Sequence, residues 1–188
     1  MPRLFVGLEL PEPVRERLAL VKGPLPGARW IEPDDMHLTL RFIGDIDNPT
    51  ADELAGFLAS IETHPFEVRV TGLGCFGGND PRTIHAAVEG GVALDLLQKS
   101  VDRAARSAGI PPEPRSFTPH ITLARLKGTP PDVVARFLGS RGRWQPMAFI
   151  VDRFTLFSSR PRQGGGPYVV EEAFVLGPYS GSGWQPAD

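Results

Sequence analysis

The sequence has little cysteine and no long apolar run. Its one cysteine, Cys75, excludes an intramolecular disulfide framework and a thiolate-rich zinc site. No stretch approaches the roughly 20 apolar residues that a membrane-spanning helix needs, and residues 1–11 lack the apolar core and small-residue cleavage site of a signal peptide. We therefore expect a cytoplasmic protein with no membrane partner.

The chain also lacks an excess of positive charge. Twenty Lys and Arg residues against 22 Asp and Glu residues give a formal net charge of -2, with a pI near 6.1. Proteins that coat long nucleic acids rely on many phosphate contacts by Lys and Arg, so this class is excluded. A single phosphate-bearing end remains open, because one or two arginines in a pocket can hold a phosphate.

The composition is that of one compact unit. The hydrophobic fraction of 41% and the charged fraction of 22% are close to globular averages, and a chain of this length can form one core or two small packed lobes. The 20 prolines and 21 glycines are scattered between apolar runs and mark turns. We predict a single two-lobed domain over residues 1–178 and a loose tail over residues 179–188.

Short strands and helices alternate irregularly. Apolar patterns predict strands over residues 4–10, 29–31, 37–44, 66–70, 83–88, 120–126, 149–157 and 168–176. Helices are predicted after the first strand and over residues 50–61, 92–108 and 131–138, with Thr50 and Glu53 as a capping box and 158–166 as a hairpin loop. Several connections are too short for parallel crossovers, so the predicted class is α+β, with antiparallel sheets and helices packed on one face.

Two of the four histidines open predicted strands with the same pattern. His37-Leu-Thr-Leu and His120-Ile-Thr-Leu each have apolar residues at the second and fourth positions. A chance repeat has a composition probability on the order of one in a thousand. A lone histidine on such a strand is more often structural, whereas the repeated motif favours function.

Strand geometry gives the two motifs a shared chemistry. Side chains at i and i+2 lie on one face of a strand, so each histidine points with its threonine while the apolar residues pack beneath. Two imidazoles can exchange protons near neutral pH, one accepting from a nucleophile and the other donating to a leaving group. Neither a metal nor a cofactor is required, and none is expected.

The motifs resemble the signature of the 2H phosphoesterase superfamily. Residues 3–11, 30–44 and 117–125 are similar in order and spacing to its bacterial and archaeal RNA 2',3'-cyclic phosphodiesterase branch, historically called 2'-5' RNA ligases. The resemblance covers the chain up to about Leu176. It implies a bilobal, pseudo-twofold α+β fold with a central cleft, and hydrolysis of a 2',3'-cyclic phosphate to a 2'-phosphomonoester.

The resemblance also implies a role for each site residue. His37 is expected to be the proton donor to the departing 3' oxygen, and His120 the proton acceptor that activates water. Thr39 and Thr122 would hold phosphate oxygens, assisted by Arg125. Strict alternation places Arg125 on the face opposite His120, so it reaches the site only if the strand ends or bulges there.

Several alternatives stay open. His64 and His85 have no repeated partner motif, and we expect packing or surface roles for them; Arg41 either touches phosphate or is a solvated strand residue. The substrate could be an RNA end, a cyclic mononucleotide or ADP-ribose cyclic phosphate, and a hydroxyl in place of water would give ligation. A binding module without turnover and a metallohydrolase, which would need a third ligand, are the other candidates. A monomer is expected.

Overall fold

The structure is a computed structural model and describes residues 3–159 and 168–178. Its strands are β1 (Arg3–Glu9), β2 (Ala28–Trp30), β3 (His37–Asp45), β4 (Phe66–Phe76), β5 (Thr83–Glu89), β6 (His120–Leu126), β7 (Met147–Val151), β8 (Arg153–Ser159) and β9 (Tyr168–Val175). Its helices are α1 (Glu12–Ala19), α2 (Asn48–Ala59), α3 (Gly91–Ser107) and α4 (Pro131–Ser140), with a short 3-10 helix η1 (Pro33–Asp35).

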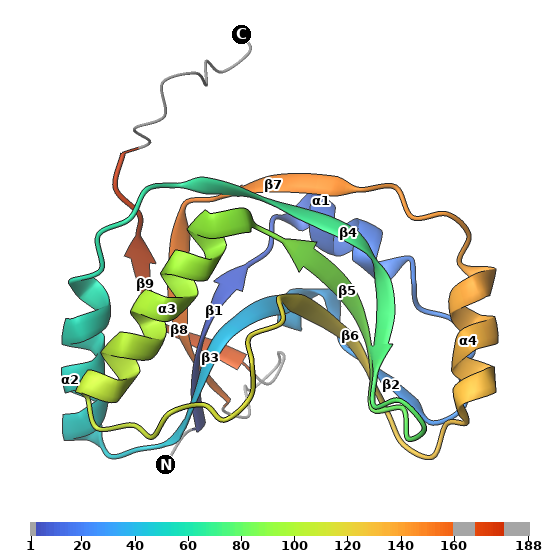
Figure 1. Ribbon diagram of the computed structural model, residues 1–188, viewed down its shortest axis with the longest axis horizontal. Coiled ribbons are helices and arrows are strands. Elements are labelled where there is room, and N and C mark those ends of the chain that lie inside the picture. Colours follow the sequence, from blue (N-terminus) through green and yellow to red (C-terminus); the bar gives the residue numbers. More distant parts are fainter. Residues whose placement is uncertain (1–2, 160–167, 179–188) are drawn as a thin grey trace, which may run out of the picture.

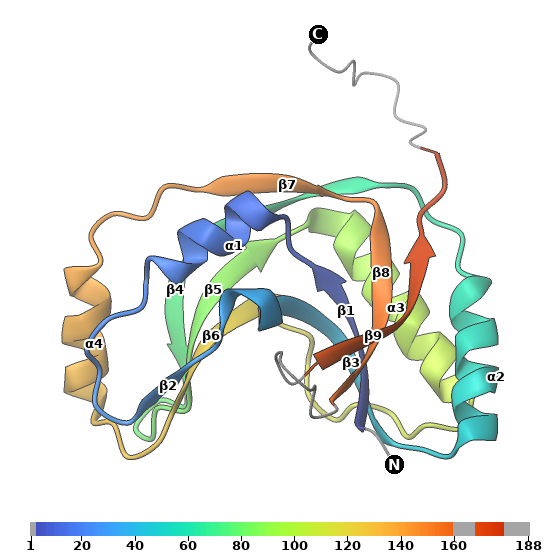
Figure 2. The same cartoon turned by 180° about the vertical axis from the view of Figure 1, so that it is seen from behind.

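The strands form one curled antiparallel sheet with helices outside it (Figure 1). The hydrogen-bonded order is β7-β4-β5-β6-β3-β1-β8-β9, and the boundary between β6 and β3 divides it into two halves. Helices α2 and α3 stand beside the half that contains β3, and α4 stands beside the half that contains β6, as the view from behind in Figure 2 also shows. The predicted α+β class and two-lobed arrangement are confirmed.

Each half of the sheet draws strands from both parts of the chain. Strand β4 follows α2 in sequence but pairs with β5 in the other half. Strand β8, late in the chain, pairs with the N-terminal β1. The two halves therefore exchange a strand and are interlocked.

The sheet forks where its two halves meet. Strands β3 and β6 pair at Leu38 and Ile121. Further along, β6 pairs instead with β2, from Ala28 opposite Leu126 to Trp30 opposite Ala124. The first residues of β3 and β6, which carry the two histidine motifs, thus come together at the fork.

The apolar residues of both motifs lie in the core, as predicted. Leu38, Leu40, Ile121 and Leu123 are between 0 and 3% exposed. Burial of each such side chain contributes about 1.5 to 3 kcal/mol. The backbone of both motifs is therefore held firmly beneath the polar side chains.

Two helices test the sequence patterns. The apolar face predicted for α3 is buried, with Leu94 and Val101 at most 1% exposed. Helix α2 begins earlier than predicted, because the Asp47 carboxylate accepts a hydrogen bond from the Thr50 backbone N–H at 2.8 Å. The predicted capping box of Thr50 and Glu53 is wrong, since a carboxylate three residues upstream already satisfies the free N–H groups.

One predicted strand is two strands in the structure. The run 149–157 is broken at Asp152 into β7 and β8, which pair with β4 and β1 in opposite halves of the sheet. Asp152 and Arg153 at the break are charged and exposed, and they separate the two apolar segments that were predicted as one strand. Strand β4 also continues past the predicted end at residue 70 to Phe76, since β5 pairs with it along that length.

Some predictions lie outside the described residues. Ser158 and Ser159 belong to β8, whereas residues 160–166 of the predicted loop and the predicted tail 179–188 are not among the described residues. The extent of the domain, 1–178, stays a prediction. Of the helices within the described ranges, none has both the length and the apolar character needed to cross a membrane.

Candidate active site

The two predicted motifs meet on neighbouring strands. Four half-buried polar side chains project from one face of the sheet: His37, Thr39, His120 and Thr122. We call this face the histidine face. Leu38 pairs with Ile121, and the same antiparallel register carried one residue either way sets His37 across from Thr122.

Both imidazoles are anchored in the same way. Nδ1 of His37 donates to the Asp35 carbonyl at 2.8 Å, and Nδ1 of His120 donates to the Thr118 carbonyl at 2.7 Å. A carbonyl oxygen can only accept, so each Nδ1 carries the proton and each Nε2 is left for chemistry. A neutral ring then offers an acceptor at Nε2, and a charged ring offers a donor there.

A bulge at the last residue of each motif decides where the next residues point. In the pairing of β1 with β3, Gly7 faces Thr39 and Val6 faces Arg41, so Leu40 is the extra residue. In the pairing of β5 with β6, His85 faces Thr122 and Ile84 faces Ala124, so Leu123 is extra. Because a bulge inserts one extra residue, each residue after it points to the face opposite the one that strict alternation predicts.

The bulge at Leu123 brings Arg125 onto the histidine face. Leu123 and Ala124 are both buried, whereas Arg125 is exposed and pairs with Thr83 of β5. Residues 83, 85 and 87 alternate on β5 opposite Arg125, Thr122 and His120, so these three β6 side chains share a face. The structure meets the condition that the sequence set for Arg125.

The bulge at Leu40 has the opposite result for Arg41. Its side chain is 4% exposed and turns toward α3, where Nε donates to the Asp102 carboxylate at 2.8 Å. The guanidinium also donates to the carbonyl oxygens of Phe42 and Pro111. Both interpretations from sequence, phosphate contact and solvated strand residue, are wrong, because the extra residue rotates Arg41 into the core.

Aromatic rings surround His37. Phe5, Tyr168 and Phe157 lie with their ring centroids 4.7, 5.0 and 5.8 Å from the imidazole. Sequence reasoning missed Phe157 and Tyr168, since only the long-range pairing of β8 and β9 with β1 brings them here. Phe5 packs directly against the candidate catalytic ring.

This environment sets the charge of His37. Burial lowers the pKa of the imidazole to about 4, against an opposing contribution from the hydrogen bond to Asp35. The positive charges of Arg125 and His120 lower this pKa further. His37 is therefore neutral at neutral pH when the site holds no anion.

His120 has a different set of neighbours. The Phe76 ring lies 4.9 Å away and the His85 ring 5.6 Å away, both edge to face. His85 itself is 8% exposed and stacks on Phe76 at 3.9 Å. Burial, and secondarily the positive charge of His120, lower the pKa of His85 to about 4. Packing was expected for His85, but its place beside His120 was not.

A glycine makes room for the His85 ring. Gly74 faces His85 across β4 and β5, and a Cβ atom at Gly74 would lie 2.8 Å from Nε2 of His85. The ring therefore lies over the bare backbone of β4. Its Nδ1 is buried and has no hydrogen-bond partner among the described residues. Alternation along the predicted strand 83–88, applied from Thr83, would have placed His85 on the same face as Thr83.

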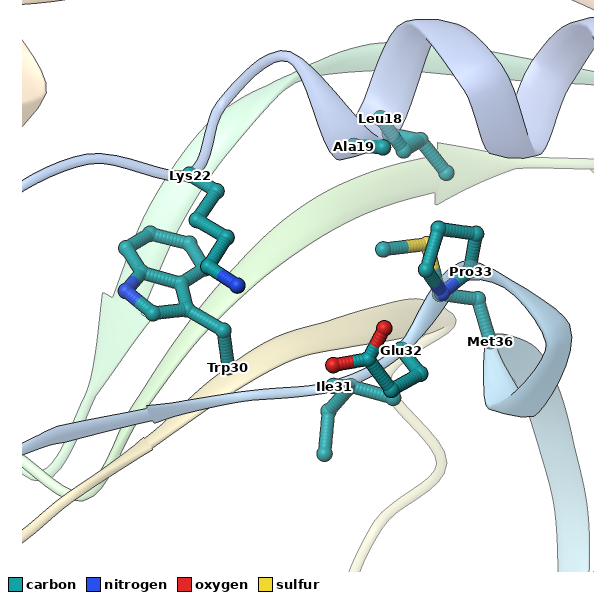
Figure 3. Close-up of a pocket in the computed structure, with 8 residues that line it drawn as sticks. All are labelled: Leu18, Ala19, Lys22, Trp30, Ile31, Glu32, Pro33 and Met36. Atoms are coloured by element: carbon teal, nitrogen blue, oxygen red, sulfur yellow. The ribbon is translucent and has the colours of Figure 1, made fainter. Parts of the chain in front are cut away.

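The described residues offer no metal site, and the cavity that they form lies away from the histidine motifs. The described residues contain no group of three or more His, Cys, Asp or Glu side chains that could hold a metal ion. A cavity of about 210 Å³ lies between α1, β2 and η1 (Figure 3). Its walls include Leu18, Trp30 and Met36, with Lys22 and Glu32 as its charged groups. None of the predicted site residues lines it.

Comparison with known proteins places this chain among relatives of matching length. A protein of Aquifex aeolicus named RNA 2',3'-cyclic phosphodiesterase is 31% identical over 183 residues, covering 93% of this chain and 97% of the relative. One of the same name from Aeropyrum pernix is 42% identical over 117 residues, covering 61% of this chain and 65% of the relative.

Solved structures share the fold. The protein TT0787 of Thermus thermophilus is 30% identical, with a TM-score of 0.71 over 93% of this chain and 97% of its own. E. coli LigT, in a complex with 3'-AMP, has a TM-score of 0.73 at 23% identity, over 93% of this chain and 98% of its own. The family model described as LigT like Phosphoesterase matches residues 8–85 and 87–168, each segment holding one histidine motif. The chain therefore belongs to the family of LigT-like phosphoesterases.

Proposed function

We propose that this protein is an RNA 2',3'-cyclic phosphodiesterase that opens the cyclic phosphate of an RNA end to a 2'-phosphomonoester. The observation that carries the proposal is the pair of imidazoles on one face, each with Nδ1 bonded to a backbone carbonyl and with no hydrogen bond to Nε2 from the described residues. Relatives of nearly equal length carry this name. Their shared family supports transfer of the reaction class.

In the proposed reaction, water attacks phosphorus and the bond from phosphorus to the 3' oxygen breaks. Nε2 of His120 takes the proton from water, and Nε2 of His37 gives a proton to the departing oxygen. A donor must be protonated, whereas the empty site keeps His37 neutral. The negative charge of the bound phosphate raises the pKa of His37, so protonation accompanies substrate binding.

Three further residues hold the phosphate in this proposal. The hydroxyls of Thr39 and Thr122 donate to its oxygens, and the Arg125 guanidinium neutralises its charge. Their support is positional, because all three share the histidine face. Arg125 also lies close enough to His37 to affect its charge.

Hydrolysis of an oligonucleotide ending in a 2',3'-cyclic phosphate, in the presence of a chelator, tests the function. We expect turnover by the wild type, a 2'-phosphate product by phosphorus NMR, and losses of about 10²- to 10⁴-fold in His37→Ala and His120→Ala. The matched control is His64→Ala, since His64 is exposed and outside the site. Robust turnover by either site variant would return both histidines to structural roles.

We also propose that residues 1–178 act as one domain and as a monomer in the cytoplasm. The exchange of β4 and β8 between the two halves supports a single folding unit, and one chain supplies both motifs. Light scattering of the purified protein and limited proteolysis test these points. A dimer, or two separately stable fragments, would contradict them.

A further inference from the structure

Two arginines face each other across β2 and β6. Arg29 is the cross-strand partner of Arg125, and directly opposed residues point to the same face. The next residue, Trp30, points to the other face, where its ring centroid lies 5.6 Å from that of Phe137 on α4. Alternation therefore sets Arg29 on the histidine face beside Arg125.

Nothing in the described part of the chain neutralises this pair. Both arginines are exposed, and over residues 3–159 and 168–178 neither forms an ion pair with a carboxylate. Like charges directly opposite each other on a sheet are destabilising. Such a pair is typical of a site that receives an anion.

The row of polar groups continues on the other side of Arg125. Thr83 of β5 is its cross-strand partner, and the Thr83 Oγ1 atom is buried without a hydrogen-bond partner among the described residues. Arg29, Arg125 and Thr83 thus lie side by side across β2, β6 and β5. Along β6, the side chains on the histidine face are His120, then Thr122, then Arg125, so this row lies just beyond Thr122.

We propose that Arg29 binds the phosphodiester on the 5' side of the terminal nucleotide, so that the site selects RNA ends over mononucleoside cyclic phosphates. The inference rests on the proposed function. Arg125 follows the second histidine motif on β6, and Arg29 lies opposite it on β2, so one anion at the motifs and a second beside Arg29 would each meet a cation. A nucleoside 2',3'-cyclic phosphate carries only the first of these anions.

A series of three substrates isolates the second anion. Adenosine 2',3'-cyclic phosphate has only the cyclic phosphate, its 5'-phosphorylated form adds a monoester, and the dinucleotide ApA with the same end adds a phosphodiester. In Arg29→Ala we expect kcat/KM to fall about tenfold on the dinucleotide through KM, and less than twofold on adenosine 2',3'-cyclic phosphate. Arg29→Lys should recover part of the loss, because a point charge remains.

Salt dependence gives a second readout that a structural role would not move. For a single-stranded substrate each lost phosphate contact reduces the slope of log affinity against log salt by about 0.7. Arg29→Ala should show this reduction on the dinucleotide, and the exposed Arg136→Ala on α4 should not. Because removal of one like charge relieves repulsion, Arg29→Ala should melt no lower than the wild type.

Equal losses on all three substrates, or no loss on any, would overturn the proposal. Selective loss on the 5'-monoester alone would also overturn it, since the anion would then be a free phosphate and not a diester. Binding of a 2'-phosphorylated ApA to wild type and Arg29→Ala, measured by calorimetry, decides the matter without turnover. An inactive wild type would refute the proposed function, and the binding difference would still test Arg29.

Discussion

The two halves of the sheet repeat a backbone but not its chemistry. Over their first seven residues, β3 and β6 have the same sequence of half-buried, buried and exposed positions, and each has a bulge at the last leucine of its motif. The sixth residue of each strand is the exposed one. It is Phe42 in one half and Arg125 in the other. The repeated backbone therefore holds the two imidazoles in equivalent positions, whereas the sixth residue of each strand can differ.

The neighbouring strands extend this difference. His37 lies among Phe5, Phe157 and Tyr168, whereas His120 lies beside the His85 imidazole and on the same strand as Arg125. An acid and a base of the same residue type need unequal surroundings. The comparison teaches that the asymmetry comes from side chains outside the motifs, on β3 and β6 themselves and on the strands beside them, because the motifs are alike.

The strongest test of the difference between the two histidines is a substrate whose leaving group needs no proton from His37. A cyclic phosphate with sulfur in place of the 3' oxygen has a leaving group that departs without protonation. On this substrate we expect His37→Ala to return to within about tenfold of the wild type, while His120→Ala stays about 10³-fold lower. Paired rate measurements on the oxygen and sulfur substrates provide the test. Recovery of His120→Ala instead would exchange the two roles.

Acid should weaken the fold, because two buried imidazoles resist protonation. The pKa of His37 and of His85 is about 4 when folded and about 6.5 when unfolded. Below about pH 6.5 the unfolded chain binds more protons, so the free energy of unfolding falls as pH drops toward 4 and is unaffected above. This difference in pKa corresponds to at most roughly 3 kcal/mol of lost stability per ring, and solvent screening reduces the figure.

Urea denaturation at a series of pH values measures this loss. His85→Phe keeps the stacking on Phe76 and should remove about half of it, whereas the exposed His64→Ala should not change it. An unchanged slope in His85→Phe would mean that His85 accepts a proton in the folded protein.

The sixth position of each strand separates charge from packing. Arg125→Ala should lower kcat/KM about 10- to 100-fold, since hydrogen bonds to charged groups are worth about 1.5 to 3 kcal/mol. Phe42→Ala, at a side chain that is 49% exposed, should cost less than threefold. Steady-state kinetics on one oligonucleotide compare the two. Equal effects would contradict a phosphate role specific to Arg125.

The smallest effect is expected at His85. In the other half Gly7 holds the place opposite Thr39 that His85 holds opposite Thr122, so the reaction does not need a ring at both places. His85→Phe should therefore stay within about threefold of wild-type kcat, because a neutral stacked ring is retained. A larger loss in kcat with unchanged KM would assign His85 a part in the proton transfers.

Most of the fold could be predicted from local sequence patterns. The motifs, the apolar face of α3 and the strand over 120–126 were predictable because period and burial agree within each element. The split of 149–157 was missed, although the charged and exposed residues Asp152 and Arg153 interrupt the apolar run at the break. Which strand pairs with which depends on contacts far apart in sequence.

The candidate site divides in the same way. The histidine pair followed from a repeated motif, whereas the side that Arg125 or Arg41 takes depends on an extra residue that no local signal marks. Tyr168 and Phe157 could not be placed near His37 without the strand order. Sequence reasoning thus found the polar groups at the fork and missed the aromatic rings that reach it from β8 and β9.

The pairing of β1 with β8 sets the order in which the protein can become complete during synthesis. Arg3 pairs with Ser159, so the first strand to leave the ribosome waits for one of the last before its edge is satisfied. Contacts this distant in sequence slow folding. The surroundings of His37 consequently form only when nearly the whole chain has been made, and a prematurely terminated chain would hold both histidine motifs without a working site.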